Sequence, residues 1–440
     1  MRIRTLSGAW LVLIGLAGCP GGLPTPDAGT MPDGGQLDAG TSRVTGSGQA
    51  LVSQGGGVVV VGSVSRTSTD SEFLLVRYHG DGGVDSSFGT NGTTTTQFDP
   101  YIDPVVADAG FPTEQKTDTA YAVVLQGDKL LVGGTAASQG DLSGAYAVTR
   151  YSAAGVLDPS FGVAGRALVR VRMGGPVHAL ALRSDGKIYA AGFVSTGNPG
   201  TNGANLAIVR FSSEGSVDST FGGAQGVVGD FGKNEDVRGL AFQNLKVLAG
   251  GGDDFLVARY NDDGSLDPSF GVAGVAKSPG GFANNFRALP SGGLLLSGSR
   301  RTTSDGPWVL KLVRYTFDGQ LDTTFGTAGV LEAPLDNRQV STLGLELLPD
   351  GRILTVNVGG FGSGSGPIAT AARYSAAGVV DTGFGTSGVL ALDASLPLLL
   401  GQYPPSPNNV ALAGDRLLFT HTDVYAGMNP KVIFRSYPLP

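Results

Sequence analysis

The stretch ARYNDDGSLDPSFGVAG, from Ala258 to Gly274, decides the fold because close variants of it occur five more times along the 440-residue chain. Each variant begins with an arginine and an aromatic residue. A glycine, an aspartate and a Phe-Gly pair follow that arginine at five, eight and eleven residues, and a second glycine closes the unit. We call this unit the repeat phrase. The six phrases begin at Arg77, Arg150, Arg210, Arg259, Arg314 and Arg373. Constant offsets within phrases that recur every 49 to 73 residues indicate a repeat architecture.

Between the phrases, the sequence predicts short β-strands. In one interval the runs HALAL (178–182), KIYAAG (187–192) and LAIVRF (206–211) are short and largely apolar, and they are bounded by Gly, Asp or Ser. A further strand is expected after each Phe-Gly pair, which makes four strands per unit, and no window after the leader has a sustained helical period. Four short strands per repeat are typical of a propeller blade, whose faces must be covered by neighbouring blades.

The number of units predicts a ring of seven blades. Six phrases account for six blades, and the C-terminal stretch supplies strand-like runs in which Arg435 stands where a phrase would begin. Arg43 to Gly48 would complete this last blade as its fourth strand, and closure would remove the exposed sheet edges of an open array. We therefore predict an all-β fold, a β-propeller of four-stranded blades, over residues 43–440. Rings of six or eight blades and an open solenoid of the same units are the alternatives.

Residues 1–18 are predicted to be a lipoprotein signal peptide. Two arginines precede the apolar run AWLVLIGL (9–16), which is too short to span a bilayer as a helix. The following LAGC, which ends at Cys19, resembles the lipobox of bacterial lipoproteins, in which the cysteine is acylated and becomes the new N-terminus. Cys19 is the single cysteine of the chain, and acyl chains on it would anchor the protein to a membrane. An ordinary secretory signal with an incidental cysteine is the alternative.

Residues 19–42 are predicted to be a lipidated, disordered linker that leads to the propeller. They are rich in Pro, Gly, Asp and Ala and contain no aromatic residue, so they cannot bury enough apolar surface to offset their chain entropy. In enteric bacteria an aspartate after the lipidated cysteine tends to retain lipoproteins at the inner membrane. Pro20 stands there in this chain, which favours the outer membrane over the inner one. We expect an exported, lipid-anchored protein of the cell envelope, attached to its membrane through the N-terminal lipid.

An aspartate occurs in every phrase, and we predict a structural role for it. The six are Asp85, Asp158, Asp218, Asp267, Asp322 and Asp381. Each can accept backbone N–H groups in an Asx turn and can pair with the arginine eight residues upstream. The phenylalanine would then fill the gap between blades, and the glycines would permit positive φ angles.

The fourth phrase also contains part of an oxygen-rich calcium-loop pattern, formed by Asn261, Asp263 and Asp267. A calcium loop needs several carboxylates, and the other phrases do not provide them, because Ala154 and Ala377 stand at the position of Asp263. The structural role is therefore the main prediction, with no metal or other cofactor. Calcium in the fourth phrase alone is the alternative.

The whole pattern resembles the delta-60 repeat family of bacterial exported and surface proteins. The likeness is carried by Arg-Tyr, by Gly-x-x-Asp-x-x-Phe-Gly-x-x-Gly, and by strands of the type DGKI and AG between the phrases, and it extends over Arg43 to Pro440. The resemblance implies a propeller-like repeat domain and no general catalytic activity. The chain departs from the pattern by an inserted residue before Gly226, by Phe211 in place of tyrosine, and by its incomplete seventh unit.

The sequence gives little support for catalysis. The three histidines, His79, His178 and His421, occupy unrelated places in the repeat and have no metal-ligand spacing. Neither a Gly-x-Ser-x-Gly elbow nor a dinucleotide loop is present. We therefore assign no catalytic residue and expect a protein that is not an enzyme. A hydrolase or lyase with a site at the central channel, assembled from several blades, is the alternative.

Composition and loops favour binding. The net charge of −7 and the lack of a basic run argue against nucleic acid as a partner. The connections between the second and third strands vary in length, from Gly251–Asp254 to Gly197–Asn205 and Gly360–Pro367, and an insertion spans Gln97–Asp118. Such loops bind ligands when a rigid scaffold presents them, but they also vary freely. We expect a monomeric binding or scaffold module for a protein or a polysaccharide, whose identity the sequence leaves open.

Overall fold

The computed structural model describes residues 44–67, 70–98, 116–136, 144–171, 174–195, 203–334, 340–359, 368–393, 409–423 and 430–439. All of them belong to one compact unit, Asp38–Pro440. The predicted signal peptide, Cys19 and the linker lie outside the described residues, as does most of each long loop named above. Within the described ranges, no helix is long and apolar enough to cross a membrane.

The described chain forms seven blades of four antiparallel strands each, which we call blades 1 to 7. A short strand, β6 (Lys116–Thr117), also pairs in parallel with Asp70 and Ser71 of blade 1, and blades 4 and 5 are hydrogen-bonded into one eight-stranded sheet. Blade 1 comprises β2 (Ser47–Gln54), β3 (Gly57–Ser65), β4 (Asp70–Tyr78) and β5 (Thr93–Thr96). Blade 2 comprises β7 (Thr119–Gln126), β8 (Lys129–Ala136), β9 (Ala145–Tyr151) and β10 (Arg166–Val169). Blade 3 comprises β11 (Val177–Leu182), β12 (Ile188–Ser195), β13 (Ala204–Phe211) and β14 (Val227–Gly229).

The remaining blades have the same strand order. Blade 4 comprises β15 (Gly239–Gln243), β16 (Lys246–Asp253), β17 (Leu256–Tyr260) and β18 (Val275–Ala276). Blade 5 comprises β19 (Phe282–Ala288), β20 (Leu294–Arg301), β21 (Trp308–Tyr315) and β22 (Val330–Ala333). Blade 6 comprises β23 (Val340–Leu347), β24 (Ile353–Gly359), β25 (Ile368–Tyr374) and β26 (Val389–Asp393). Blade 7 comprises β27 (Val410–Ala413), β28 (Arg416–Asp423), β29 (Lys431–Pro438) and β1 (Val44–Thr45).

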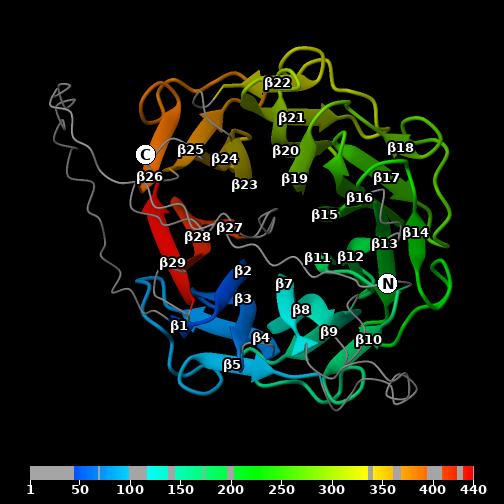
Figure 1. The fold of residues 1–440 in the computed structure, drawn as a ribbon, viewed down its shortest axis with the longest axis vertical. Coiled ribbons are helices and arrows are strands. Elements are labelled where there is room, and N and C mark those ends of the chain that lie inside the picture. The colour runs from blue at the N-terminus through cyan, green and yellow to red at the C-terminus, as the bar shows by residue number, and fades with distance from the viewer. Residues whose placement is uncertain are drawn as a thin grey trace, which may run out of the picture. The chain divides into compact units, whose positions relative to one another are not determined.

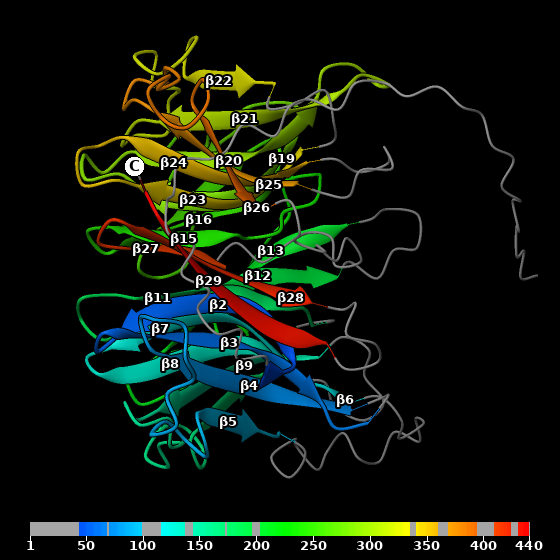
Figure 2. The same ribbon diagram turned by 90° about the vertical axis from the view of Figure 1, so that its left-hand side faces the viewer.

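The blades follow one another around a central axis in chain order (Figure 1). The first strand of each blade lies innermost and the fourth outermost, so the seven innermost strands β2, β7, β11, β15, β19, β23 and β27 surround the axis. Each repeat phrase connects the third strand of a blade to the fourth. The phrases and the turns between first and second strands lie on one face, on the left in Figure 2, which we call the phrase face.

The ring closes through the N-terminal strand of the described chain. Val44 pairs with Val432 and Thr45 with Lys431, so β1 completes blade 7 as its fourth strand. The prediction of a seven-bladed all-β propeller is thereby confirmed, and the open solenoid is wrong. The predicted closing strand, Arg43 to Gly48, was too long. The chain leaves β1 at Gly46, whose φ of +139° is unfavourable for other residues, and Ser47 already begins blade 1.

The hydrophobic core is divided among the contacts between blades. It consists of seven clusters of buried side chains, and each cluster draws its residues from two adjacent blades. Blades 4 and 5 are also joined by hydrogen bonds, because Gly252 and Asp253 of β16 pair with Ala283 and Phe282 of β19. Stability therefore depends on each blade's neighbours, as in other repeat proteins.

Most innermost strands contain a β-bulge near their first residues. The register shifts occur at Gln49, Tyr121, His178, Asn284 and Leu343 in blades 1, 2, 3, 5 and 6. In blades 4 and 7, Arg238 and Asn409 occupy the corresponding place directly before β15 and β27. A bulge bends its strand and changes where a side chain points. We call these seven residues the bulge ring.

Candidate functional site

The aspartates of the phrases form the same contacts in all six copies. The Nε atom of the upstream arginine lies 2.7 to 2.9 Å from an aspartate oxygen. The other carboxylate oxygen accepts the backbone N–H of the residue two positions later, at 3.0 to 3.2 Å. The Asx turn and the ion pair expected from the sequence are thus both present at each of these aspartates.

The phrase also binds the next blade. In the fourth phrase, Arg259 donates through Nη1 to the carbonyl of Phe317 at 3.0 Å, and the Gly271 N–H donates to the carbonyl of Asp318 at 2.8 Å. The ring of Phe270 is fully buried against Gly319, where a Cβ would lie 2.8 Å from the ring. Equivalent arginine-to-carbonyl bonds join each of blades 1 to 5 to the blade that follows. The phrase is therefore a clasp between consecutive blades.

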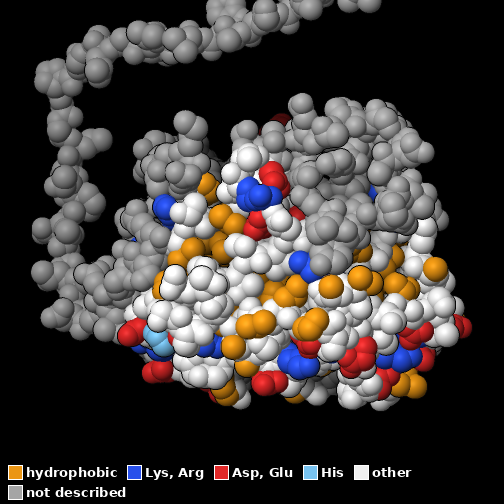
Figure 3. Space-filling model, turned by 90° about the horizontal axis from the view of Figure 1, so that it is seen from below, with side chains coloured by type: hydrophobic (Ala, Val, Ile, Leu, Met, Phe, Trp, Pro, Cys, Tyr) orange, Lys and Arg blue, Asp and Glu red, His pale blue; other side chains and the backbone are white. Residues whose placement is uncertain are grey.

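A second cation reaches the aspartate in four of the phrases. Lys129, Lys187, Lys246 and Arg352 each approach the aspartate of their own blade within 3.1 Å. Burial alone would raise the pKa of Asp267, but hydrogen bonds from Lys246 and Ser269 and the charge of Arg259 hold it well below its usual range. Asp85 has no such lysine, and there the hydroxyl of Ser87 makes the largest contribution to lowering the pKa to about 2. Acidic and basic side chains accordingly gather along the lower edge of Figure 3, where the phrase face lies.

The candidate calcium ligands of the fourth phrase are engaged with protein groups. Asn261 donates to the hydroxyl of Ser265 at 3.0 Å, and Asp263 accepts the N–H and the hydroxyl of Ser265 at 2.9 and 2.7 Å. Asp267 is held by Arg259 and Lys246. In the part of the chain that the structure describes, no group of three or more His, Cys, Asp or Glu side chains is placed to hold a metal ion.

The histidines occupy separate environments. The His79 side chain is exposed, with its Nε2 atom 3.8 Å from Asp85. His178 is buried in the bulge ring, and the side chain of His421 lies outside the description. The structure therefore does not bring His79 and His178 together.

A cluster of polar side chains does converge near the axis. The Nδ1 atom of His178 lies 2.8 Å from Asp236, whose other oxygen accepts a hydrogen bond from Arg238 at 2.5 Å. The ring of Tyr121 meets that of His178 edge-on, with 5.2 Å between centroids. Burial lowers the pKa of His178, and although burial would raise the pKa of Asp236, the charge of Arg238 and the contact with His178 lower it.

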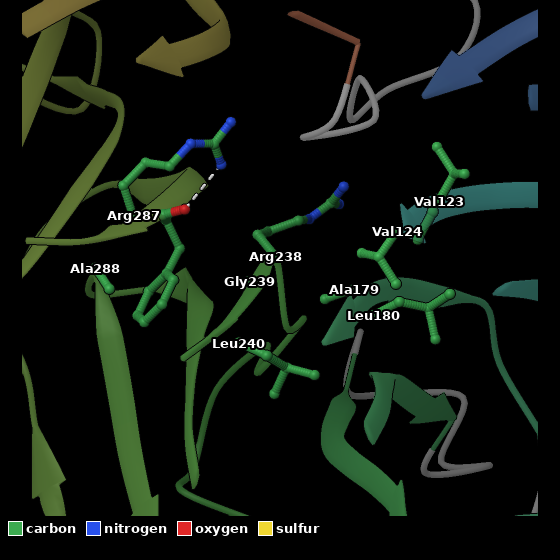
Figure 4. Close-up of a pocket in the computed structure, with 11 residues that line it drawn as sticks. Val123, Val124, Ala179, Leu180, Arg238, Gly239, Leu240, Arg287 and Ala288 are labelled. Carbon is green, nitrogen blue, oxygen red and sulfur yellow. Dashed lines mark hydrogen bonds between the residues drawn. The ribbon is translucent and has the colours of Figure 1, made fainter. Parts of the chain in front are cut away.

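An axial cavity of about 170 Å³ adjoins this cluster. Its walls come from β7, β11, β15 and β19, and they are mostly small or apolar side chains together with Arg238 and Arg287 (Figure 4). Arg287 donates to Glu346 of blade 6 at 2.8 Å and to the carbonyl of Phe286 at 3.0 Å. A concave pocket with convergent polar groups is a candidate ligand site.

Sequence reasoning assigned no function to Asp236, Arg238 or Arg287. The available signal was a lack of repetition: where the phrases keep one residue type at each offset, the bulge ring has Gln, Tyr, His, Arg, Asn, Leu and Asn. Aligning the innermost strands would have revealed these differences. It would not have shown that the seven positions surround one axis, because that follows only from closure of the ring.

The closed ring of seven four-stranded antiparallel blades defines a β-propeller. In agreement with this fold, five segments match the model of a family described as "Domain of unknown function (DUF5122) beta-propeller", namely residues 56–88, 126–161, 183–221, 246–270 and 289–325. Each segment ends at the phenylalanine of a phrase. The matches support a propeller repeat family.

Comparison with curated proteins gives no match. Among solved structures, a polysaccharide lyase named Uly1 is 11% identical, with a TM-score of 0.43 over 89% of this chain and 90% of that one. A puromycin hydrolase is 14% identical, with a TM-score of 0.44 over 90% of this chain and 54% of that one. The Bacillus subtilis arabinanase Arb43A is 10% identical, with a TM-score of 0.35 over 90% and 96%. No activity is transferred to this chain from likenesses of this kind.

Proposed function

We propose that the protein is a lipid-anchored binding module of the cell envelope that holds a ligand at its central channel and carries out no chemistry of its own. One observation supports this proposal: the phrase face repeats the same contacts from blade to blade, whereas the bulge ring differs at every step around the axis. A scaffold alone would need similar residues at equivalent places. Different residues at equivalent positions around one axis give the surroundings of a ligand no rotational symmetry, as recognition of an asymmetric ligand requires.

The ligand is expected to be a protein or a polysaccharide, and we propose from the resemblance of the repeats that the chain belongs with the delta-60 proteins. The channel is preferred over the long loops as the site, because its residues are held by rigid strands. The monomer remains our expectation, since one ring already contains the complete channel.

Attachment to the membrane is proposed from the sequence around Cys19. Cys19→Ser should release the protein from the membrane fraction, because the acylated thiol would be lost and the short leader cannot span a bilayer. Fractionation of cells that express either form measures this. If the variant still sediments with membranes, the lipobox interpretation is wrong. Separation of inner and outer membranes from the unaltered strain would test the outer-membrane proposal.

Binding at the channel can be tested by ligand-induced stabilisation. The full chain in detergent would be heated with each of a set of neutral and acidic oligosaccharides and short peptides, since a ligand of the folded state raises the melting temperature. We expect a stabilising ligand whose effect is lost in Tyr121→Ala, a change in the bulge ring. Phe317→Ala is the control, because Phe317 is an exposed aromatic residue of the phrase face. Equal stabilisation of both variants would place the ligand outside the channel.

A hydrolase or lyase is the second candidate, and the His178–Asp236 contact favours it. A neutral imidazole oriented by a carboxylate is the arrangement of a general base, and Tyr121 and Arg238 lie beside it. The same incubations distinguish the two functions. Turnover of an oligosaccharide that disappears in His178→Gln would establish the enzyme, whereas reversible binding without product would support the binding module.

A further inference from the structure

Two arginines from adjacent blades line the axial cavity. Arg238 precedes β15 of blade 4 and Arg287 belongs to β19 of blade 5, and Figure 4 shows both side chains directed the same way. Their partners, Asp236 and Glu346, are not part of the cavity wall. The side chain of Arg238 is fully buried, so Arg287, whose side chain is 26% exposed, is the cation of this pair that a ligand in the cavity can reach.

We infer that the axial cavity binds the carboxylate-bearing terminal residue of an acidic saccharide. This inference rests on the proposed function and names the ligand class for the same channel. Arginine presents N–H groups in a planar fork that fits a carboxylate in two parallel hydrogen bonds. Such a contact adds geometric specificity to the attraction between the charges.

Arg287 is the residue best placed to make this contact. A guanidinium has five N–H donors, and among the described residues Arg287 uses two of them, on Phe286 and Glu346. Its side chain is 26% exposed, so it is not sealed inside the blade. Glu346 fixes its orientation in advance, which reduces the entropy lost when a ligand binds.

The dimensions of the cavity select a single sugar ring. A cavity of about 150 Å³ holds one benzene molecule, so the axial cavity of about 170 Å³ admits one six-membered ring. The cavity surface is mostly polar, and Ala122, Val124 and Leu240 supply the smaller apolar part that can contact the C–H groups of such a ring. A peptide that binds as an added strand or as a helix in a groove needs an extended surface, which a cavity of this size does not provide.

The test is a calorimetric titration of the full chain in detergent with three probes. These are a disaccharide ending in glucuronate, its counterpart ending in glucose, and a short glutamate-rich peptide. We expect the glucuronate probe to bind and Arg287→Gln to weaken it by about tenfold, the loss expected for one charge-assisted hydrogen bond. Arg287→Lys keeps the positive charge but lacks the planar pair of N–H donors, so it should retain only part of the affinity.

Arg300→Gln is the matched control. Arg300 belongs to the same blade, has a side chain exposed by 28%, and pairs with Glu332, but it does not line the cavity. Its replacement should leave the affinity within about twofold, and melting scans establish that each variant is folded. Equal binding of the glucose probe, or glucuronate binding unaffected by Arg287→Gln, would overturn the inference. The proposed binding at the channel would still be tested separately by Tyr121→Ala. Peptide binding that depends on Arg287 would show that the ligand is not a saccharide, but it would leave carboxylate binding at the cavity in place.

Discussion

Replacing Phe270 with alanine is expected to lower the free energy of unfolding of the propeller by about 4 kcal/mol. Phe270 is fully buried between blades 4 and 5 and packs in one cluster with Phe286 and Tyr315 of blade 5. The guanidinium of Arg259 also lies 4.6 Å from the centroid of its ring. The substitution removes the ring from both blades, and Gly319 has no side chain to fill the space. Urea denaturation measures the loss.

Phe317→Ala is the matched control for this prediction. Phe317 is an aromatic residue of the same face, but it is 49% exposed, so its removal should cost less than about 1 kcal/mol. Phe270→Leu should fall between the two, because leucine restores part of the buried volume. If Phe270→Ala and Phe317→Ala cost the same, the phrase is not the clasp between blades that the geometry indicates.

The fold could be predicted because the phrase is itself a contact between consecutive blades. A residue that must meet the neighbouring blade at a fixed place, such as Phe270 against Gly319, cannot change type or offset without loss of that contact. The spacing of residues within each phrase is therefore constant, although the gaps between phrases vary. Strand ends were less predictable. The two residues of β1 carry no pattern that separates them from β2, and the turn at Gly46 became visible only in the structure.

The channel site could be predicted only in part. A bulge adds one residue to a strand without changing its composition. The sequence therefore does not show that Tyr121 and His178 interrupt the alternation of inward and outward side chains along their strands. Asp236 lies just before a strand and resembles a loop residue. Its contact with His178 joins blades 3 and 4 across 58 residues of sequence. Such convergence depends on the closed ring, which local sequence patterns do not encode.

Asp267→Asn is expected to lower the free energy of unfolding by about 3 kcal/mol at neutral pH, because it leaves the buried guanidinium of Arg259 without its counter-ion. Asp267 holds Arg259, whose side chain is 5% exposed, and Lys246 at 2.6 Å. Asp322→Asn is the graded control. Asp322 is more exposed, at 23%, and its one ion pair is with Arg314, so the loss should be smaller. Thermal melts of both variants against the unaltered protein test this order.

The same aspartate gives a pH dependence of defined sign. The folded-state pKa of Asp267 is held below the unfolded value of about 3.9, so the unfolded chain binds the proton first as acid is added. The contribution of this ion pair is therefore complete above the unfolded pKa and disappears as the pH falls through the folded pKa. The unaltered protein should lose stability below about pH 4 more steeply than Asp267→Asn, which has no carboxylate to protonate there. Parallel acid titrations, followed by circular dichroism, measure the stability of both proteins against pH. If both lost stability with the same slope, Asp267 would take up no extra proton on unfolding, and its proposed role in joining the blades would be wrong.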